Sequence, residues 1–393
     1  MSSERKNREK NGIWSLRVYL FAAYAGMTVI MSYLPVFFQH VGLSSSQIGL
    51  LMAVGPLASI FSQPAWGFLS DKYQTIKRML SLAIVGLLFS AGLFMFVSGF
   101  TAYLVLVFLT FLFMSPSTAL ADSLAARTAN AHHISFGSIR LWGSLGFGFA
   151  SLTVGVFLDS VGISYLFAAL AFFAFWSLIF SHFLVDLPIA GKVVTLKSVF
   201  TSGIIRVLAL FLLLVAFVSL THRANDIYLG LYIVELGGSE SLIGTAWFIG
   251  VVTEALMLAL SFLWFRRFHP LVFLIIACFI YAIRWMFMAN ATSPEMLLLI
   301  QCLHGVSFAM FYVSAIQFVT KIIPDHLQAT GHMLYLTTFF GVSGMIGSLL
   351  GGWWIDQFGM ASLYTGMAIS AAIAGLSIFV AKGRLLQTEA EMS

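Results

Sequence analysis

The chain consists largely of long apolar runs separated by short polar breaks, and this pattern constrains the fold more than any other feature. One run, MLSLAIVGLLFSAGLFMFVSGF from Met79 to Phe100, contains no charged side chain. About 20 apolar residues are enough for a helix to cross the hydrocarbon core of a bilayer. A helix also satisfies its backbone hydrogen bonds within one segment, which lipid requires. Runs of this kind therefore predict transmembrane helices.

The small number of charged residues excludes a soluble globular protein. Only 9% of the 393 residues are charged and 60% are hydrophobic, whereas about a quarter of the residues in a soluble domain are charged. Counting apolar runs between polar or Gly/Pro breaks predicts twelve spans, and we expect an all-α membrane protein. The predicted spans are residues 14–38, 46–70, 76–98, 101–125, 135–158, 163–185, 204–233, 240–264, 269–290, 294–320, 327–355 and 361–382.

Lysine and arginine gather in alternate loops, and this predicts the orientation of the chain. Cytoplasmic loops of membrane proteins carry an excess of these residues, and the intervening loops, such as HVGLSSSQ and NATSPE, carry none. We therefore expect both termini on the cytoplasmic side of the cell membrane. The net charge of +5 follows from this asymmetry and does not indicate nucleic-acid binding. The residues concerned are Arg5, Lys6, Arg8, Lys10, Lys72, Lys77, Arg78, Arg127, Lys192, Lys197, Arg266, Arg267, Lys321, Lys382 and Arg384.

A short motif recurs along the chain and indicates internal repeats. Gly-x-x-x-Asp occurs as GFLSD at 67–71, GVFLD at 155–159 and GWWID at 352–356, near the ends of the second, fifth and eleventh spans. Nested three-helix repeats are typical of secondary transporters. The predicted organisation is a cytosolic tail at 1–12, a six-helix bundle at 13–186, a basic cytosolic linker at 187–203, a second six-helix bundle at 204–383 and a cytosolic tail at 384–393.

Several stretches resemble a known group of transporters. GFLSDKYQTIKR at 67–78 is similar to the signature loop of the major facilitator superfamily, although Gln74 stands where a glycine is usual. LADSLA at 120–125, FGSIRLWGSLGF at 136–147, GVVTEALMLALSFLWFRRF at 250–268 and the segments IRWMFM and IQCLHGVSF resemble the lactose permease and 3-phenylpropionate permease group of proton symporters. The resemblance implies the two-bundle fold, alternating access with substrate bound between the bundles, and a proton gradient as the driving force. Because the charges of this loop lie near the helix ends, we expect Gly67, Asp71, Lys72 and Arg78 to gate the inner face rather than to bind substrate.

Arg140 is a charge inside a predicted span, so it needs a partner. Asp122 and Arg140 lie nine positions on either side of residue 131, where we place the turn between the fourth and fifth spans. On antiparallel helices this spacing gives them a similar depth, and an arginine can bind a carboxylate through two hydrogen bonds. The pair either fixes the helix register or binds substrate. The resemblance favours substrate binding, and places Phe147 where the family has a tryptophan that stacks on the sugar ring.

Glu254, Arg284 and His304 are charged or titratable side chains within the second half. Glu254 lies in the apolar run VVTEALMLAL, and such surroundings favour the protonated form of a carboxyl group. Arg284 and His304 match the coupling arginine and histidine of the resembled group at the same spacing of 20 residues. By resemblance, the three residues form a cluster for proton coupling and substrate binding.

The chain also departs from the resembled group. Ser307 stands where lactose permease has a glutamate, so either Glu254 or Asp226 would titrate instead or the coupling differs from that of the resembled group. The lysine partners of the aspartate that matches Asp226 are replaced by Gln301 and Gly341, which leaves Arg223 as its expected partner. A methionine at 257 replaces an amide that binds galactosides, which argues against galactoside transport.

The predicted function is secondary transport, with proton-coupled uptake of a small organic solute such as an aromatic acid or a sugar-like molecule. A proton-coupled efflux antiporter is one alternative, and a non-transporting membrane receptor or scaffold is another. We find no nucleophile motif, coenzyme fingerprint or metal-ligand spacing, so we expect no enzymatic activity, no cofactor and no metal. The expected partners are the solute, protons and the lipid bilayer, and the expected state is a monomer.

Overall fold

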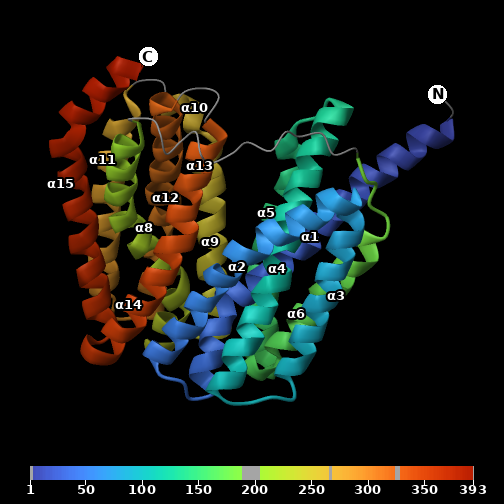
Figure 1. Ribbon diagram of the computed structural model, residues 1–393. Helices are drawn as coiled ribbons and strands as arrows, with labels where there is room; N and C mark the ends of the chain where they lie inside the picture. The colour runs from blue at the N-terminus through green and yellow to red at the C-terminus, as the bar shows by residue number, and fades with distance from the viewer. Residues whose placement is uncertain (1–2, 188–203, 265–267, 324–327, 393) are drawn as a thin grey trace. The chain divides into compact units, whose positions relative to one another are not determined.

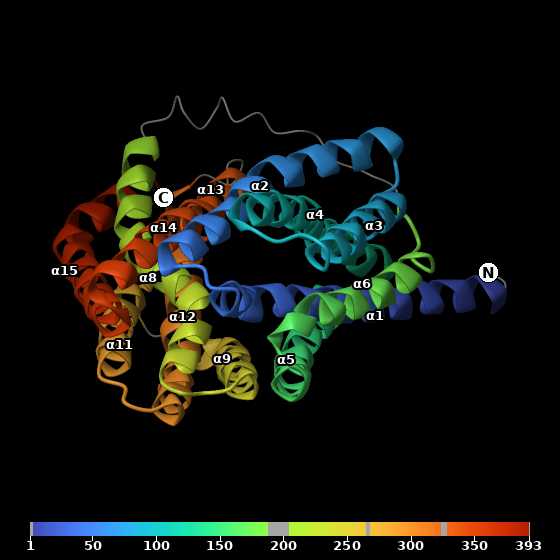
Figure 2. The same cartoon turned by 90° about the horizontal axis from the view of Figure 1, so that it is seen from below.

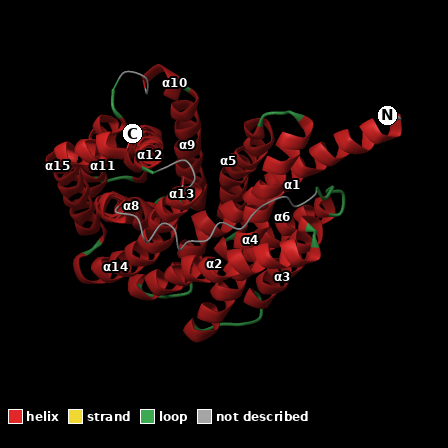
Figure 3. Ribbon diagram, turned by 45° about the horizontal axis from the view of Figure 1, so that its top comes forward, coloured by secondary structure: helices red, strands yellow, loops and turns green. Residues whose placement is uncertain are grey.

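The computed structural model describes residues 3–187, 204–264, 268–323 and 328–392, and within these ranges the chain is almost entirely helical (Figure 3). Twelve of the described helices are long and apolar enough to cross a membrane, which confirms the predicted number of spans. The linker predicted at 187–203 lies, apart from Leu187, outside the described residues, as do the basic side chains at 192, 197, 266 and 267.

The chain divides into two compact units. Unit 1 contains residues 1–191 together with 239–248, and unit 2 contains residues 192–238 together with 249–393. Helix α9 (Glu240–Ala259) therefore contributes its first part to unit 1 and its second part to unit 2.

Unit 1 is a bundle in which α1 packs against α4, α5 and α6, and α3 packs against α4 and α6 (Figures 1 and 2). Helix α2 packs on α4. The elements are α1 (Ser3–His40), α2 (Ser45–Tyr73), α3 (Ile76–Phe94), α4 (Phe100–His132), α5 (Phe136–Val161), the short 3-10 turn η1 (Ile163–Tyr165) and α6 (Leu166–Ser181).

Unit 2 is a second helical bundle, in which α11 packs against α12 and α15, and α8 packs against α12, α14 and α15. Its elements are α8 (Ile204–Glu235), the second part of α9, α10 (Ser261–Trp264), α11 (Pro270–Ala289), α12 (Pro294–Ile322), α13 (Gln328–Leu336), η3 (Thr337–Val342), α14 (Ser343–Phe358) and α15 (Met360–Met392). The π-helical turn η3 lies between α13 and α14 within one membrane span, Thr330–Phe358.

Several helices are longer than the predicted membrane spans. Helix α1 begins at Ser3, so most of the predicted tail at 1–12 is helical, and α15 continues to Met392 through the predicted tail at 384–393. Helix α4 runs to His132, beyond the predicted end at 125. The polar turns of these helices project past the apolar span, as tilted or extended transmembrane helices do.

The repeated Gly-x-x-x-Asp motif occupies an equivalent position in three helices. Asp71, Asp159 and Asp356 each lie two residues before the end of their helix, at Tyr73, Val161 and Phe358 respectively. This agreement supports the interpretation of the motif as part of a structural repeat.

The signature loop at 67–78 contains a left-handed turn and a capped helix start. Gln74 has φ 51° and ψ 37°, a conformation that favours glycine, which explains why a glycine is usual here. The Asp186 carboxylate, which follows α6, accepts hydrogen bonds from the backbone N–H groups of Ile76 and Lys77, both at 2.8 Å. It therefore satisfies the first free N–H groups of α3.

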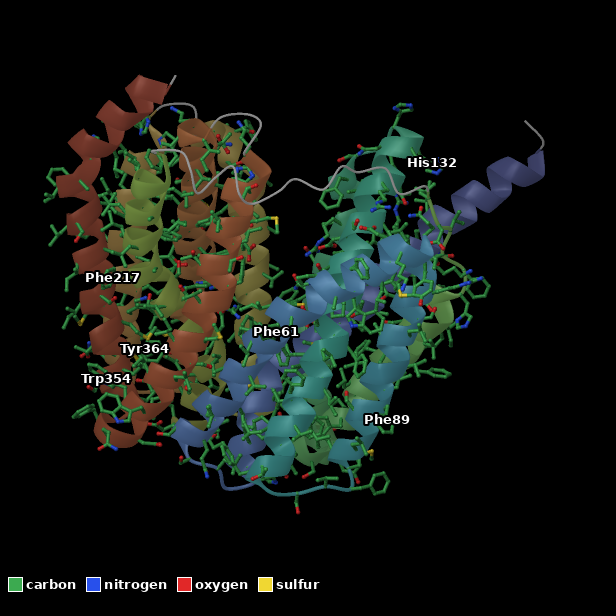
Figure 4. The ribbon with its side chains drawn as sticks, viewed as in Figure 1. Phe61, Phe89, His132, Phe217, Trp354 and Tyr364 are labelled. Atoms are coloured by element: carbon green, nitrogen blue, oxygen red, sulfur yellow. The ribbon has the colours of Figure 1, made fainter. Side chains whose placement is uncertain are left out.

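Large apolar side chains cover the outer surfaces of the helices. Phe61 on α2 and Phe89 on α3 are 63% and 64% exposed, and Phe217 on α8 is also exposed (Figure 4). A bilayer can cover such side chains at no cost, whereas water cannot. Their number fits the predicted membrane environment.

Helices α1 and α5 cross closely because Gly146 has no side chain. A Cβ atom at Gly146 would overlap the backbone carbonyl oxygen of Phe21. Farther along the same helix pair, the Tyr33 hydroxyl donates a hydrogen bond of 2.8 Å to the backbone oxygen of Ser151. Small residues allow this kind of close packing between transmembrane helices.

We expect Gly146→Ala to destabilise unit 1 by about 1–3 kcal/mol, because the added methyl group forces α1 and α5 apart. The matched control is Gly92→Ala in α3, where a Cβ atom meets nothing within 4 Å. Thermal unfolding of the purified protein in detergent checks this. Equal midpoints for the two variants would contradict the close crossing.

Candidate functional site

Arg140 in unit 1 is held by a carboxylate and an aromatic ring. Its Nε lies 3.1 Å from Asp122 Oδ1, and its guanidinium carbon lies 3.9 Å from the centre of the Tyr24 ring. The Tyr24 hydroxyl donates a hydrogen bond of 2.7 Å to Asp122 Oδ2. The expected pairing of Arg140 with Asp122 is therefore confirmed, and Tyr24 binds both partners.

The predicted reason for this pairing was wrong. Helix α4 ends at His132 and α5 begins at Phe136, so Asp122 lies ten residues from the end of its helix and Arg140 four from the start of its own. At 1.5 Å per residue, the six-residue difference offsets the two along the helix axes by about 9 Å. The long arginine side chain spans much of this offset, so equal depth is not needed.

Gly143 provides the space in which the Arg140 guanidinium stacks on Tyr24. A Cβ atom at Gly143 would lie 2.6 Å from Arg140 Nη1 and 2.8 Å from Tyr24 Cδ2. The Arg140 and Asp122 side chains remain 29% and 34% exposed. The stacked face of the guanidinium is thus fixed, while part of the ion pair stays accessible to a polar ligand.

Phe147, the predicted stacking residue, pairs with a second aromatic ring. Its ring centre lies 5.9 Å from that of Trp247, in the part of α9 that belongs to unit 1. Among the described residues, the buried donor Trp247 Nε1 has no hydrogen-bond partner. An aromatic pair of this kind can pack against the flat face of a ring-shaped solute.

In unit 2, Asp226 is paired with Arg223 as the sequence predicted. Arg223 Nη1 donates a hydrogen bond of 2.6 Å to Asp226 Oδ2. The Arg223 guanidinium also lies 5.5 Å from the centre of the Phe340 ring, in the π-helical turn η3. This local ion pair on α8 removes the cost of an isolated charge in the membrane.

Arg284 is completely buried and has neutral hydrogen-bond partners. It donates to Gln301 Oε1 and, at 3.4 Å, to Ser307 Oγ. Its guanidinium lies 4.5 Å from the centre of the Trp285 ring. Gln301 and Ser307, two of the positions at which the chain departs from the resembled group, are thus the polar partners of this arginine.

Glu254 and His304 come together at a close helix contact. Glu254 Oε2 lies 4.0 Å from His304 Nε2, and the side chains are 30% and 9% exposed. A Cβ atom at Gly305 would overlap the backbone of Thr253, and the Gly305 N–H donates to Thr253 Oγ1 at 3.2 Å. The glycine therefore lets α12 approach α9 closely enough for the carboxylate to face the imidazole.

Sequence reasoning missed His222, which lies among these groups. The His222 side chain is buried and accepts or donates a hydrogen bond of 2.9 Å with the Tyr281 hydroxyl. Its Nε2 lies 3.7 Å from Asp226 Oδ2. The signal that could have found it is the i, i+4 spacing of His222 and Asp226, which places both on one face of α8.

Sequence reasoning also missed Tyr24 and Trp247. Tyr24 belongs to a row on α1, with Trp14, Phe21 and Thr28, in which each side chain contacts α5. The spacings of seven, three and four residues along this row, which place the four on one helix face, are visible in the sequence. Nothing in the local sequence of Trp247 shows that it meets Phe147, because that contact joins distant segments.

The residues predicted to gate the inner face lie at the end of α2 and the start of α3. Asp71, Lys72 and Arg78 are exposed, and a Cβ atom at Gly67 would meet nothing within 4 Å. Their charges are thus free to contact a partner other than their own helices.

The described residues were also considered as possible metal ligands and as the lining of a cavity in unit 1. They contain no group of three or more His, Cys, Asp or Glu residues that could hold a metal ion. A cavity of about 350 Å³ in unit 1 is lined by residues from α1, α4 and the segment after α6, including Thr128 and His132. His132 is labelled in Figure 4. The lining of this cavity contains none of the predicted site residues.

Comparisons with known proteins agree on one family. The family model described as "MFS_1 like family" matches residues 13–365. The maltose permease of Geobacillus stearothermophilus is 27% identical over 369 residues, which cover 92% of this chain and 93% of that protein. The probable 3-phenylpropionic acid transporter of Escherichia coli (strain K12) is 27% identical over 309 residues, covering 76% and 80%.

A solved structure has the same fold. The crystal structure of a mutant of the nucleoside transporter NupG superposes with a TM-score of 0.83 at 15% identity, and covers 94% of this chain and 99% of that one. At this identity the likeness concerns the fold alone.

The ion pair in unit 1 leads to a prediction about stability. We expect Asp122→Asn and Arg140→Gln to show a coupling energy of about 1 kcal/mol in a double-mutant cycle, because each single change leaves the other charge without its partner. Thermal or denaturant unfolding measures this. Arg140→Gln combined with Asp159→Asn, an exposed carboxylate near the far end of α5, should be additive. Additivity in both cycles would contradict a stabilising ion pair.

Proposed function

The chain belongs to the MFS_1 like family of the major facilitator superfamily and is a secondary transporter of small solutes; from this premise we propose that it is a proton-coupled symporter that takes up an oxygen-rich organic solute. The proposed location is the cytoplasmic membrane, with both termini on the cytoplasmic side, as the distribution of lysine and arginine indicates. The proposed state is a monomer.

The observation that carries the proposal is the contact between Glu254 and His304. A carboxyl group and an imidazole 4.0 Å apart, within membrane-spanning helices, can exchange one proton once a small side-chain movement brings them to hydrogen-bond distance. The 30% exposure of Glu254 lets a proton reach it. We assign Glu254 as the primary proton carrier, with His304 as its partner.

Arg140 and Asp122 are proposed to bind the solute. A guanidinium recognises hydroxyl or carboxylate oxygens through several directed donors, and Asp122 accepts from hydroxyl groups. Phe147 and Trp247 then supply an apolar face beside them. This combination fits both a sugar-like molecule and an aromatic acid, the two kinds of solute that the names of the relatives mention.

Arg284 and Asp226 have different proposed roles. Because Arg284 is fully buried and bonded to Gln301 and Ser307, it acts on the proton site by its charge. Asp226, bonded to Arg223, is a second carboxylate whose pairing can change when a proton arrives.

Solute and proton binding together then change the preferred conformation, which is the thermodynamic basis of coupled transport. The residues Gly67, Asp71, Lys72 and Arg78 are proposed to gate this change.

Reconstituted liposomes with a trapped pH-sensitive dye test the proposal. Maltose, 3-phenylpropionate and uridine are added outside in turn. We expect one of them to acidify the lumen, and expect Glu254→Gln to reduce this signal by about 100-fold or more, as for the loss of a group that transfers protons. Arg140→Ala should also reduce it, by weakening solute binding.

The matched control for Glu254→Gln is Glu295→Gln, which removes an exposed carboxylate from the first turn of α12. It should leave the signal unchanged. Solute uptake without proton movement would overturn the symport proposal, and alkalinisation of the lumen on adding solute would point to exchange of solute for protons. Full activity of Glu254→Gln would remove Glu254 from the mechanism.

A further inference from the structure

His222 lies in unit 2 among Asp226, Tyr281 and His304, which we call the polar cluster of unit 2. The mechanism proposed above does not use His222. Its ring stacks on Phe308 with centres 4.6 Å apart and planes 10° apart. Its ring centre lies 5.5 Å from that of His304. It therefore lies close both to the histidine that faces Glu254 and to the carboxylate of Asp226.

Both nitrogens of His222 face oxygen atoms. Nδ1 lies 2.9 Å from the Tyr281 hydroxyl, and Nε2 lies 3.7 Å from Asp226 Oδ2. In the neutral ring, Tyr281 donates to the unprotonated nitrogen or accepts from the protonated one. In the charged ring, both N–H groups have an oxygen acceptor. The surroundings of His222 thus provide hydrogen-bond partners for both of its protonation states.

Asp226 Oδ2 is shared between His222 and Arg223. It lies 2.6 Å from Arg223 Nη1, a charge-assisted hydrogen bond, but 3.7 Å from His222 Nε2, which is too long for one. A movement of about 1 Å would exchange these two distances. The Asp226 carboxylate can therefore exchange Arg223, which is always charged, for His222, which is charged only when its ring carries a proton.

Other charged and titratable groups surround His222. The guanidinium groups of Arg223 on α8 and Arg284 on α11 both act on it electrostatically. His304 on α12 lies between it and Glu254 on α9. Since burial and the two arginines oppose a further positive charge, a proton on His222 needs the Asp226 carboxylate as its partner.

We propose that His222 is a second proton-binding residue, which receives the proton from the Glu254–His304 pair and holds it between Tyr281 and Asp226. This inference rests on the proposed symport. One proton leaves the Glu254 carboxyl group, passes through the His304 imidazole and converts neutral His222 to its charged form. Glu254 becomes a carboxylate and no other reactant is consumed. The movement of Asp226 from Arg223 to His222 then links the proton to the conformation of α8.

A purely structural role for His222 makes different predictions. A packing histidine supports the fold, so its loss lowers thermal stability and reduces every transport activity together. A proton-binding histidine supports only steps with net proton movement. Exchange of labelled for unlabelled solute across the membrane needs no net proton movement, so it separates the two roles.

The experiment compares proton-driven accumulation with solute exchange in liposomes, for wild type, His222→Gln and Tyr281→Phe. The probe is whichever of maltose, 3-phenylpropionate and uridine drives proton movement in wild type. We expect His222→Gln to lose about tenfold or more of its proton-driven accumulation, within the usual range of coupling free energies, while exchange stays within about twofold. Tyr281→Phe, which removes one of the two oxygen partners, should show a smaller loss of the same kind.

His182→Gln is the matched control, because His182 lies outside the membrane spans in unit 1 and binds the backbone oxygen of Leu178. It should leave both activities unchanged. If accumulation and exchange fall together with the unfolding temperature, or if His222→Gln accumulates solute like wild type, the proposal for His222 is overturned and symport through Glu254 stands. If no solute moves protons in wild type, the symport proposal itself fails, and this inference with it.

Discussion

The cost of placing a charge in a bilayer is the constraint on which the rest of this structure depends. Arg140 is stabilised by Asp122 and by the Tyr24 ring, Arg223 by Asp226, and Arg284 by Gln301, Ser307 and the Trp285 ring. An unpaired ion in lipid is very unfavourable, so each arginine stays with the side chains that pair with it. A change of partner is therefore a discrete event, and such events are what a transporter needs to couple binding to movement.

Glycines make these pairs possible by letting helices approach. Gly143 leaves space for the Arg140 guanidinium against Tyr24, and Gly305 brings α12 against α9, so that His304 reaches Glu254. In lipid there is little hydrophobic driving force between helices, and close packing of small residues replaces it. Packing and chemistry thus depend on the same positions in the sequence.

The polar cluster of unit 2 also shows how a departure from a family pattern can be compensated. The chain has a serine and a glutamine at two positions where the resembled group has charged residues, and both neutral side chains bind Arg284. His222 and Tyr281 add a second titratable centre beside Asp226. The polar contacts of this cluster are therefore made by other residues than in the resembled group.

The sequence by itself determined the twelve helices, the membrane environment and the pairing of Asp122 with Arg140 and of Arg223 with Asp226. The helices and the membrane environment follow from apolar length and from the scarcity of charge, and the Arg223–Asp226 pair follows from spacing along one helix. Asp122 was found because Arg140 needs a carboxylate partner within the membrane, although the predicted equal depth of the two residues was wrong. Only the tertiary structure decided that Tyr24 binds Arg140, that Trp247 meets Phe147 and that His222 lies close to both Asp226 and His304. Those contacts join segments far apart in the chain, and they depend on how each helix is rotated about its axis. Rotation is set by the sum of many side-chain contacts along a helix, so no single stretch of sequence encodes it.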